Sequence, residues 1–169
     1  MRAGGTRRPR NGQATRAKRA ALLGAVLAAA LVLTGCALFD REERSVSVFD
    51  AEPGDCFLVP EEITAELTEL RQVDCGRPHQ QEAYAVVDYT PTEGAQGYPG
   101  DAVLKDFADG SCAAEFAPYV GADYRDSTLF FTYLLPSARS WEQGDDRAVT
   151  CFITTTGAPL AESVRDSQL

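Results

Sequence analysis

The chain has 169 residues, with 16 Lys or Arg and 25 Asp or Glu, and carries a formal net charge of −9. Seven basic and no acidic residues precede Cys36, so the 134 residues from Cys36 onward carry nine basic and 25 acidic side chains, a net −16. This length fits one domain. Because so acidic a domain repels phosphate backbones and anionic headgroups, its charge excludes nucleic acid as a partner.

Residues 1–35 have the features of a lipoprotein signal peptide. A basic segment precedes an apolar run, 20–33, that is too short to cross a bilayer comfortably. Leu33-Thr34-Gly35-Cys36 then places a cysteine after a small residue, the pattern at which bacterial lipoproteins are cleaved and lipidated. We therefore expect acyl chains such as palmitate on Cys36 to hold the protein on the extracytoplasmic face of the cell membrane. An uncleaved single-pass anchor is the alternative and gives the same location.

The segment after Cys36 predicts a short tether and then the start of a domain. Residues 36–46 are mostly polar and lack a period, so we expect a tether there and a folded domain over 47–156. Residues 54–59 predict a strand, and apolar residues at helical spacing predict a short helix or helical loop over 61–70. A short strand is expected at 71–75. The alternation in 82–89 predicts a longer strand, with Ala83, Ala85, Val87 and Tyr89 sharing one face.

The second half of the domain predicts one long helix between strands. Asp101 is a suitable N-cap, and Gly121 is expected to close the segment, with Pro118 ending the helix or starting a further turn. Its apolar positions recur at three- and four-residue steps: Leu104, Phe107, Ala108, Cys112 and Phe116. Residues 129–135, apolar on both faces, predict a central strand. A connection that contains Trp141 follows this strand. The last strand is expected over 147–155, with Val149, Cys151 and Ile153 on one side, and a polar tail is expected over 157–169.

These elements predict an α+β fold: an antiparallel sheet of four to five strands with one main helix, stapled by two disulfides. Once Cys36 is assigned to the lipid, four cysteines remain, and an even number in an exported domain indicates disulfides. Three pairings are open. We favour Cys56–Cys75 and Cys112–Cys151, because each closes a sequence-local loop. The second pair would join the helix to the last strand.

Several short motifs resemble one known family. They are the lipobox, Gly54-Asp55-Cys56-Phe57, the Cys-x-x-Pro-His-x-x-Glu element from Cys75 to Glu82, Tyr98-Pro99-Gly100, and Trp141 followed by Cys151. In this order they resemble the septum formation family of actinobacterial membrane-anchored and lipid-anchored envelope proteins. The resemblance runs from about Val48 to Ile153, and it implies a link to cell division.

Pro78, His79 and Glu82 form the first candidate site. His79 is the only histidine, and it could act as a general base oriented by Glu82. We favour a structural role in the turn after Cys75, since no nucleophile is placed for it. A zinc site would need carboxylates for all its other protein ligands, which is uncommon, so no metal is expected.

Trp141 and the carboxylates supply the remaining candidates. Trp141 could be a platform for a sugar ring, although a core anchor is the simpler interpretation. Asp106, Asp109 and Ser111 do not match a calcium loop, nor do Asp145 and Asp146. These side chains are expected to be solvated surface charge.

The sequence thus predicts a lipid-anchored, extracytoplasmic interaction domain with no enzymatic activity and no cofactor. Its expected partners are the membrane, through the lipid, and division or cell-wall proteins. The alternative is a hydrolase that cleaves wall glycans with two carboxylates and uses Trp141 as the sugar platform.

Overall fold

The structure is a computed structural model that describes Met1 and residues 43–60, 67–91, 93–94 and 97–169. The predicted signal peptide, Cys36 and most of the tether lie outside these residues, as does most of the helix expected over 61–70. Residues Glu42–Leu169 form one compact unit. None of the helices in the described part of the chain has the length and hydrophobicity needed to span a bilayer.

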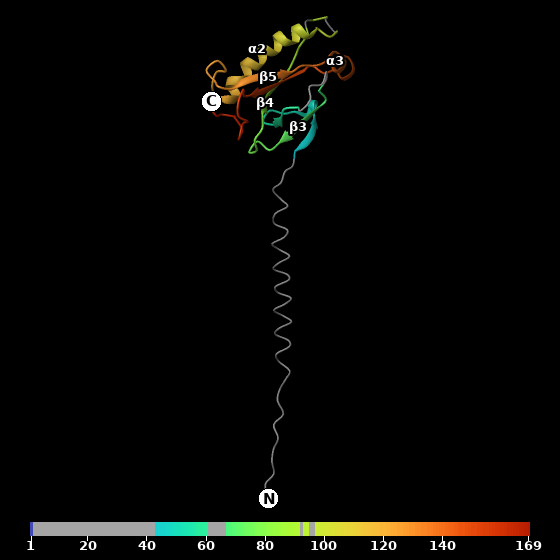
Figure 1. Ribbon diagram of the computed structural model, residues 1–169. Coiled ribbons are helices and arrows are strands. Elements are labelled where there is room, and N and C mark those ends of the chain that lie inside the picture. The colour runs from blue at the N-terminus through green and yellow to red at the C-terminus, as the bar shows by residue number, and fades with distance from the viewer. Residues whose placement is uncertain (2–42, 61–66, 92, 95–96) are drawn as a thin grey trace. The chain divides into compact units, whose positions relative to one another are not determined.

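An antiparallel sheet of six strands runs through this unit in the order β1-β3-β2-β4-β6-β5 (Figure 1). The strands are β1 Arg44–Ser47, β2 Cys56–Leu58, β3 Glu69–Val73, β4 Gln81–Asp88, β5 Phe130–Leu134 and β6 Ala148–Thr154. The predicted α+β class is confirmed, with one strand more than expected. The extra strand, β1, lies at the end of the expected tether, where the sequence Arg-Ser-Val-Ser carries little apolar signal. A 3₁₀ helix, η1, follows at Val48–Asp50.

The long helix α2 spans Asp101–Val120 and lies across one face of the sheet (Figure 1). Its buried residues include Leu104, Ala108, Cys112 and Phe116, the three- and four-residue steps that the sequence predicted. The N-cap is Gly100 rather than Asp101, and the helix continues through Pro118 to end at Gly121, whose φ of 88° suits glycine. Pro118 has no N–H to donate to the carbonyl four residues earlier, so the last turn of α2 forms without that hydrogen bond.

A β-bulge in β4 decides which side chains lie on which face of the sheet. The register with β6 shifts between Ala83 and Ala85. Ala83 packs with Phe57 and Phe152 in one cluster, whereas Tyr84 and Ala85 both pack in the cluster under α2. The predicted alternation, with Ala83 and Ala85 on one face, is therefore wrong, because the bulge inserts an extra residue. We call the α2-covered side the helix face and the other side the second face.

β5 is an edge strand, not the central strand that was predicted. Phe131 and Tyr133 pack toward the cluster under α2, and Leu134 packs against the second-face cluster. The strand therefore has apolar contacts on both faces without having neighbours on both edges. The last strand, β6, agrees with the sequence: Val149, Cys151 and Ile153 all lie in the cluster under α2.

Both predicted disulfides are confirmed, Cys56–Cys75 and Cys112–Cys151. The first joins the start of β2 to the residues after β3. The second joins α2 to β6, so a covalent bond holds the helix on the sheet. A short second helix, α3 at Ala138–Gly144, connects β5 to β6 in the sequence and contains Trp141.

The C-terminal segment, 157–169, is part of the compact unit, although the sequence predicted a polar tail outside the domain. Leu160 and Val164 are buried. Leu160 exchanges two backbone hydrogen bonds with His79, and the amides of Asp166 and Gln168 donate to the carbonyls of Tyr119 and Val120. The segment returns to the sheet because these two apolar side chains and its backbone amides find partners there.

Candidate functional site

The element from Cys75 to Glu82 brings a carboxylate into the interior of the unit. Glu82 lies on β4 opposite Ile153, on the helix face, and its side chain is fully buried. Since a buried carboxylate without partners costs several kcal/mol, its surroundings must supply donors.

Three donors from two distant parts of the chain surround this carboxylate. The hydroxyl of Tyr119, at the end of α2, donates to Oε1 at 2.5 Å, and the hydroxyl of Ser163 donates to the same oxygen at 2.6 Å. The backbone N–H of Val164 donates to Oε2 at 2.9 Å. Glu82 thus connects β4 to the end of α2 and to the C-terminal segment.

The ionisation of this site follows from those contacts. Burial raises the pKa of Glu82, but the neighbouring His79 and the hydrogen bonds from Ser163, Tyr119 and Val164 together lower it below its usual value. Burial, and then the neighbouring carboxylate, raise the pKa of the Tyr119 hydroxyl to about 12. The tyrosine therefore remains a donor to an ionised glutamate at neutral pH. The Arg165 guanidinium lies 4.6 Å from the centre of the Tyr119 ring and covers it.

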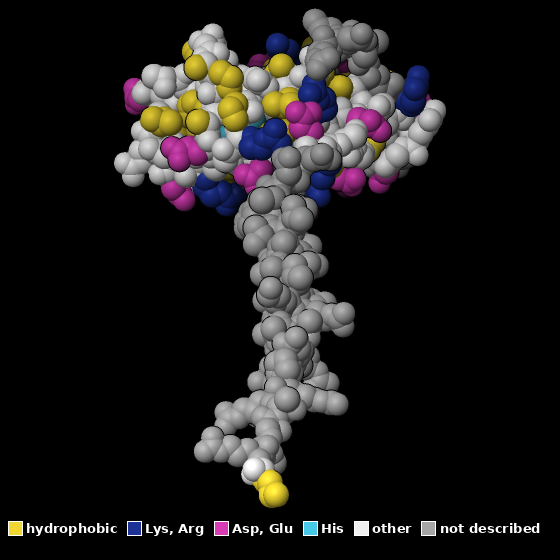
Figure 2. All heavy atoms as spheres, turned by 60° about the horizontal axis from the view of Figure 1, so that its bottom comes forward, with side chains coloured by type: hydrophobic (Ala, Val, Ile, Leu, Met, Phe, Trp, Pro, Cys, Tyr) yellow, Lys and Arg dark blue, Asp and Glu magenta, His cyan; other side chains and the backbone are white. Residues whose placement is uncertain are grey.

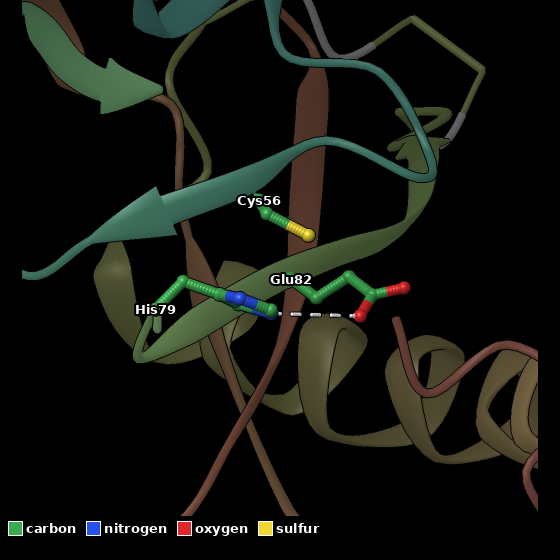
Figure 3. A group of neighbouring side chains, drawn as sticks. All are labelled: Cys56, His79 and Glu82. Carbon is green, nitrogen blue, oxygen red and sulfur yellow. Dashed lines mark ion pairs between the residues drawn. The ribbon is translucent and has the colours of Figure 1, made fainter. Parts of the chain in front are cut away.

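His79 lies beside Glu82 and is also fully buried (Figure 3). Its Nδ1 lies 2.8 Å from the carbonyl of Arg77, so Nδ1 carries the hydrogen. Nε2 points toward Glu82, at 3.9 Å from Oε2, and has no hydrogen-bond partner among the described residues. When Nε2 is protonated, the two side chains form a buried ion pair. Pro78, the residue before His79, is exposed.

A metal ion is the obvious test of this cluster, because ligand atoms of Cys56, His79 and Glu82 all lie within 4.8 Å of one another. The residues do not suit a metal as they stand. Cys56 is bonded to Cys75, so its sulfur is not the thiolate that binds zinc. Glu82 already accepts three hydrogen bonds. The chemistry of the cluster is that of an internal carboxylate–imidazole contact.

Trp141, the other candidate, is packed inside the unit with 2% of its surface exposed. The Arg147 guanidinium lies 3.7 Å from the centre of its ring, a cation–π contact. Tyr98 meets the ring edge-on, and Tyr89 lies tilted against it. A sugar ring could not stack on the indole without displacing these side chains, and this geometry favours the core anchor.

Several residues of the Glu82 site were not singled out from the sequence. Ser163, Val164 and Arg165 belong to the segment expected to be a tail, and Tyr119 lies near the end of the predicted long helix. Leu160 and Val164, four residues apart in an otherwise polar stretch, are the signal that could have indicated a packed segment. Asp145 and Asp146 lie at the end of α3, remote in sequence from Glu82.

Comparison with known proteins places these features in a family. The model of the septum formation family matches residues 40–151, about two thirds of the chain. No curated protein sequence and no solved structure matches the chain. The matched region begins before β1 and includes Glu82 and all four cysteines of the two disulfides. The protein is therefore a member of the septum formation family.

Proposed function

We propose that the protein is a lipid-anchored, non-enzymatic interaction domain that acts outside the cytoplasmic membrane in septum formation. The observation that carries the proposal is the family match over 40–151. The name of that family links its members to cell division. Because a fold alone does not determine function, we assign the division-related role to the surface of the domain.

Export and anchoring are supported by the sequence before the domain and by the disulfides within it. The basic segment, the apolar run and Leu33-Thr34-Gly35-Cys36 follow the order of a lipoprotein signal. Two disulfides are typical of proteins that fold in an oxidising compartment, outside the cytoplasm.

A non-enzymatic role is supported by how the titratable residues are used. The single histidine is buried, with Nδ1 bonded to the backbone and Nε2 facing Glu82. The Glu82 carboxylate is itself enclosed by Tyr119, Ser163 and Val164. Both groups serve contacts between segments of the chain, and neither is exposed to a substrate.

The test is the location of the protein in dividing cells. A fusion of the full chain to a fluorescent protein that matures outside the cytoplasm should gather at the division plane. The Cys36→Ala variant, which lacks the lipid attachment site, should lose both membrane association and this pattern. A fusion spread evenly around the membrane would remove septum formation from the proposal.

The rival function, a wall-glycan hydrolase, is tested on the purified full chain. Its carboxylates would have to include others such as the exposed Asp145 or the half-buried Asp146, since Glu82 is enclosed. Release of soluble fragments from isolated cell walls, abolished by Asp145→Asn or Asp146→Asn, would overturn the non-enzymatic role.

A further inference from the structure

The second face of the sheet carries a pocket of about 360 Å³, a size typical of ligand sites. Its floor is a row of three side chains across neighbouring strands: Val86 on β4, Thr150 on β6 and Leu134 on β5. One wall is η1, with Val48 and Phe49. Residues at the start of α3 and in the loop after it, Ser137, Ser140 and Asp146, also line the pocket.

The apolar side of this pocket is open to solvent. Phe49 is 65% exposed and Val86 is 42% exposed, although both line the pocket. Burying such side chains against a partner is favourable, at roughly 25 cal/mol per Å² of apolar surface. Exposed apolar side chains grouped around a pocket are typical of a surface that binds a partner.

The polar side of the pocket carries a carboxylate, which favours a partner with a positively charged group. Asp146 lines the pocket and accepts hydrogen bonds from the Ser140 hydroxyl at 2.8 Å and the Ala148 N–H at 3.1 Å. Within the described residues no Lys or Arg side chain pairs with this carboxylate, since Arg147 forms its ion pair with Asp145 instead. The Asp146 carboxylate is therefore oriented by neutral donors.

The charge of the domain adds a second constraint. The residues from Cys36 onward carry a net −16. Figure 2 shows acidic side chains spread among basic ones over the face in view. A second copy of the chain would bring the same charge to the pocket and be repelled, whereas a cationic partner would be attracted.

We infer that this pocket, which we call the second-face groove, binds a basic, apolar peptide segment of another protein. An apolar side chain of the segment lies over Val86, Leu134 and Phe49, and a neighbouring Lys or Arg pairs with Asp146. The inference rests on the proposed function, because it assigns the surface through which an interaction domain would act.

The test begins with random peptides displayed on phage and selected on the immobilised full chain. The enriched peptides should combine an apolar residue with a Lys or Arg close to it in sequence. One enriched peptide is then synthesised with a fluorescent label, and its affinity for the full chain is measured by anisotropy.

Matched variants separate binding in the groove from general attraction. Val86→Thr removes apolar surface in the groove and should weaken binding about 3- to 5-fold, whereas Val103→Thr, on α2 with 43% exposure, should change nothing. Asp146→Asn should weaken binding about 3- to 10-fold at low salt, whereas Asp145→Asn, one residue away with the same charge change, should not. Phe49→Asn should weaken it ~10-fold or more.

Several outcomes overturn the inference. The selection could enrich no peptide, or it could enrich acidic or uncharged peptides. Alternatively, each variant and its control could lose affinity for the peptide to the same extent. A dimer of the full chain in sedimentation that Phe49→Asn dissociates would assign the groove to a second copy instead. None of these results affects the septal location of the fluorescent fusion, so failure of the groove is distinguishable from failure of the proposed function.

Discussion

At the scale of single residues, the buried carboxylate of Glu82 joins several segments that lie far apart in the sequence. Its carboxylate accepts from Tyr119, Ser163 and Val164 and faces His79. A buried charge is tolerated only while all its partners are present, so substitutions here act on the folding of the whole unit.

Glu82→Gln is expected to lower the free energy of unfolding by about 2–4 kcal/mol, because an amide N–H would face donors and the charge opposite His79 would be lost. The measurement is urea unfolding with the disulfides intact. Glu142→Gln, an exposed position on α3, is the control and should change stability by less than about 0.5 kcal/mol. Equal stability of the two variants would contradict the role given to Glu82.

The same site predicts a dependence of stability on pH. The pKa of Glu82 is lower in the folded than in the unfolded chain, so the unfolded chain binds more protons as the pH falls. Its contribution is present above the unfolded pKa, about 4.3, and is lost as the pH falls through the folded pKa. The stability difference between the parent and Glu82→Gln should therefore shrink between about pH 6 and pH 3. A constant difference would contradict this linkage.

His79→Ala should act on stability rather than on function. It removes a fully buried ring and the hydrogen bond from Nδ1 to the Arg77 carbonyl, which together should cost ~2–4 kcal/mol. The measurements are the melting temperature and septal localisation of the fusion at a temperature where the variant is folded. An unchanged melting temperature with lost localisation would favour an active-site role for the imidazole.

At the scale of elements, the C-terminal segment completes the core although it has no helix or strand. Leu160 and Val164 fill the cluster under α2, and the backbone of Leu160 pairs with His79. The segment supplies two of the three donors to Glu82, so the buried carboxylate depends on the last residues of the chain.

Deletion of residues 158–169 should therefore lower the free energy of unfolding by ~3–5 kcal/mol or prevent folding. Deletion of Leu169 alone, which is exposed, is the matched control. Hydrogen exchange of the parent gives an independent measurement. The amides of Leu160, Val164, Asp166 and Gln168 should be protected, and exchange at the rate of an unstructured peptide would contradict the packing.

The sequence predicted those elements whose side chains follow a regular period. The steps from Leu104 to Phe116 indicated α2, and Val149, Cys151 and Ile153 indicated the helix face of β6. The bulge in β4 was not predictable from the sequence. Ala83, Ala85 and Val87 stand at every second position, which is the pattern of a regular strand, and nothing in this pattern shows where a strand contains an extra residue. The edge position of β5 depends on which strands pair, and no local pattern carries that information.

The candidate site was predictable only in part. Cys75, His79 and Glu82 stood out as a motif, and the two disulfide pairings were favoured among three because each closes a sequence-local loop. The partners of Glu82 in the C-terminal segment lie about 80 residues away, at sequence separations of 81 and 82. Contacts at such separation depend on the tertiary fold, and the polar composition of that segment hid its two buried side chains.

At the scale of the whole molecule, the expected mature protein begins at Cys36, with all of the strongly basic segment removed. Mass spectrometry of the protein from its native membrane should find Cys36 as the first residue, carrying acyl chains. The Cys36→Ala variant should retain its leader or appear without a lipid. An amino terminus at Met1, or an unmodified Cys36 in the native protein, would contradict the lipoprotein assignment.

The position of β1 has a mechanical consequence for a protein held at Cys36. Tension on the chain would reach the edge strand β1 first, where four residue pairs join it to β3. Peeling the chain away from Arg44 to Asp55 would add roughly 40 Å of slack at ~3.3–3.6 Å per residue. The Cys56–Cys75 bond would then carry the load directly to Cys75, so the loop between these two cysteines would not be extended. The first residues of the domain could thus yield under load before the load reaches β4.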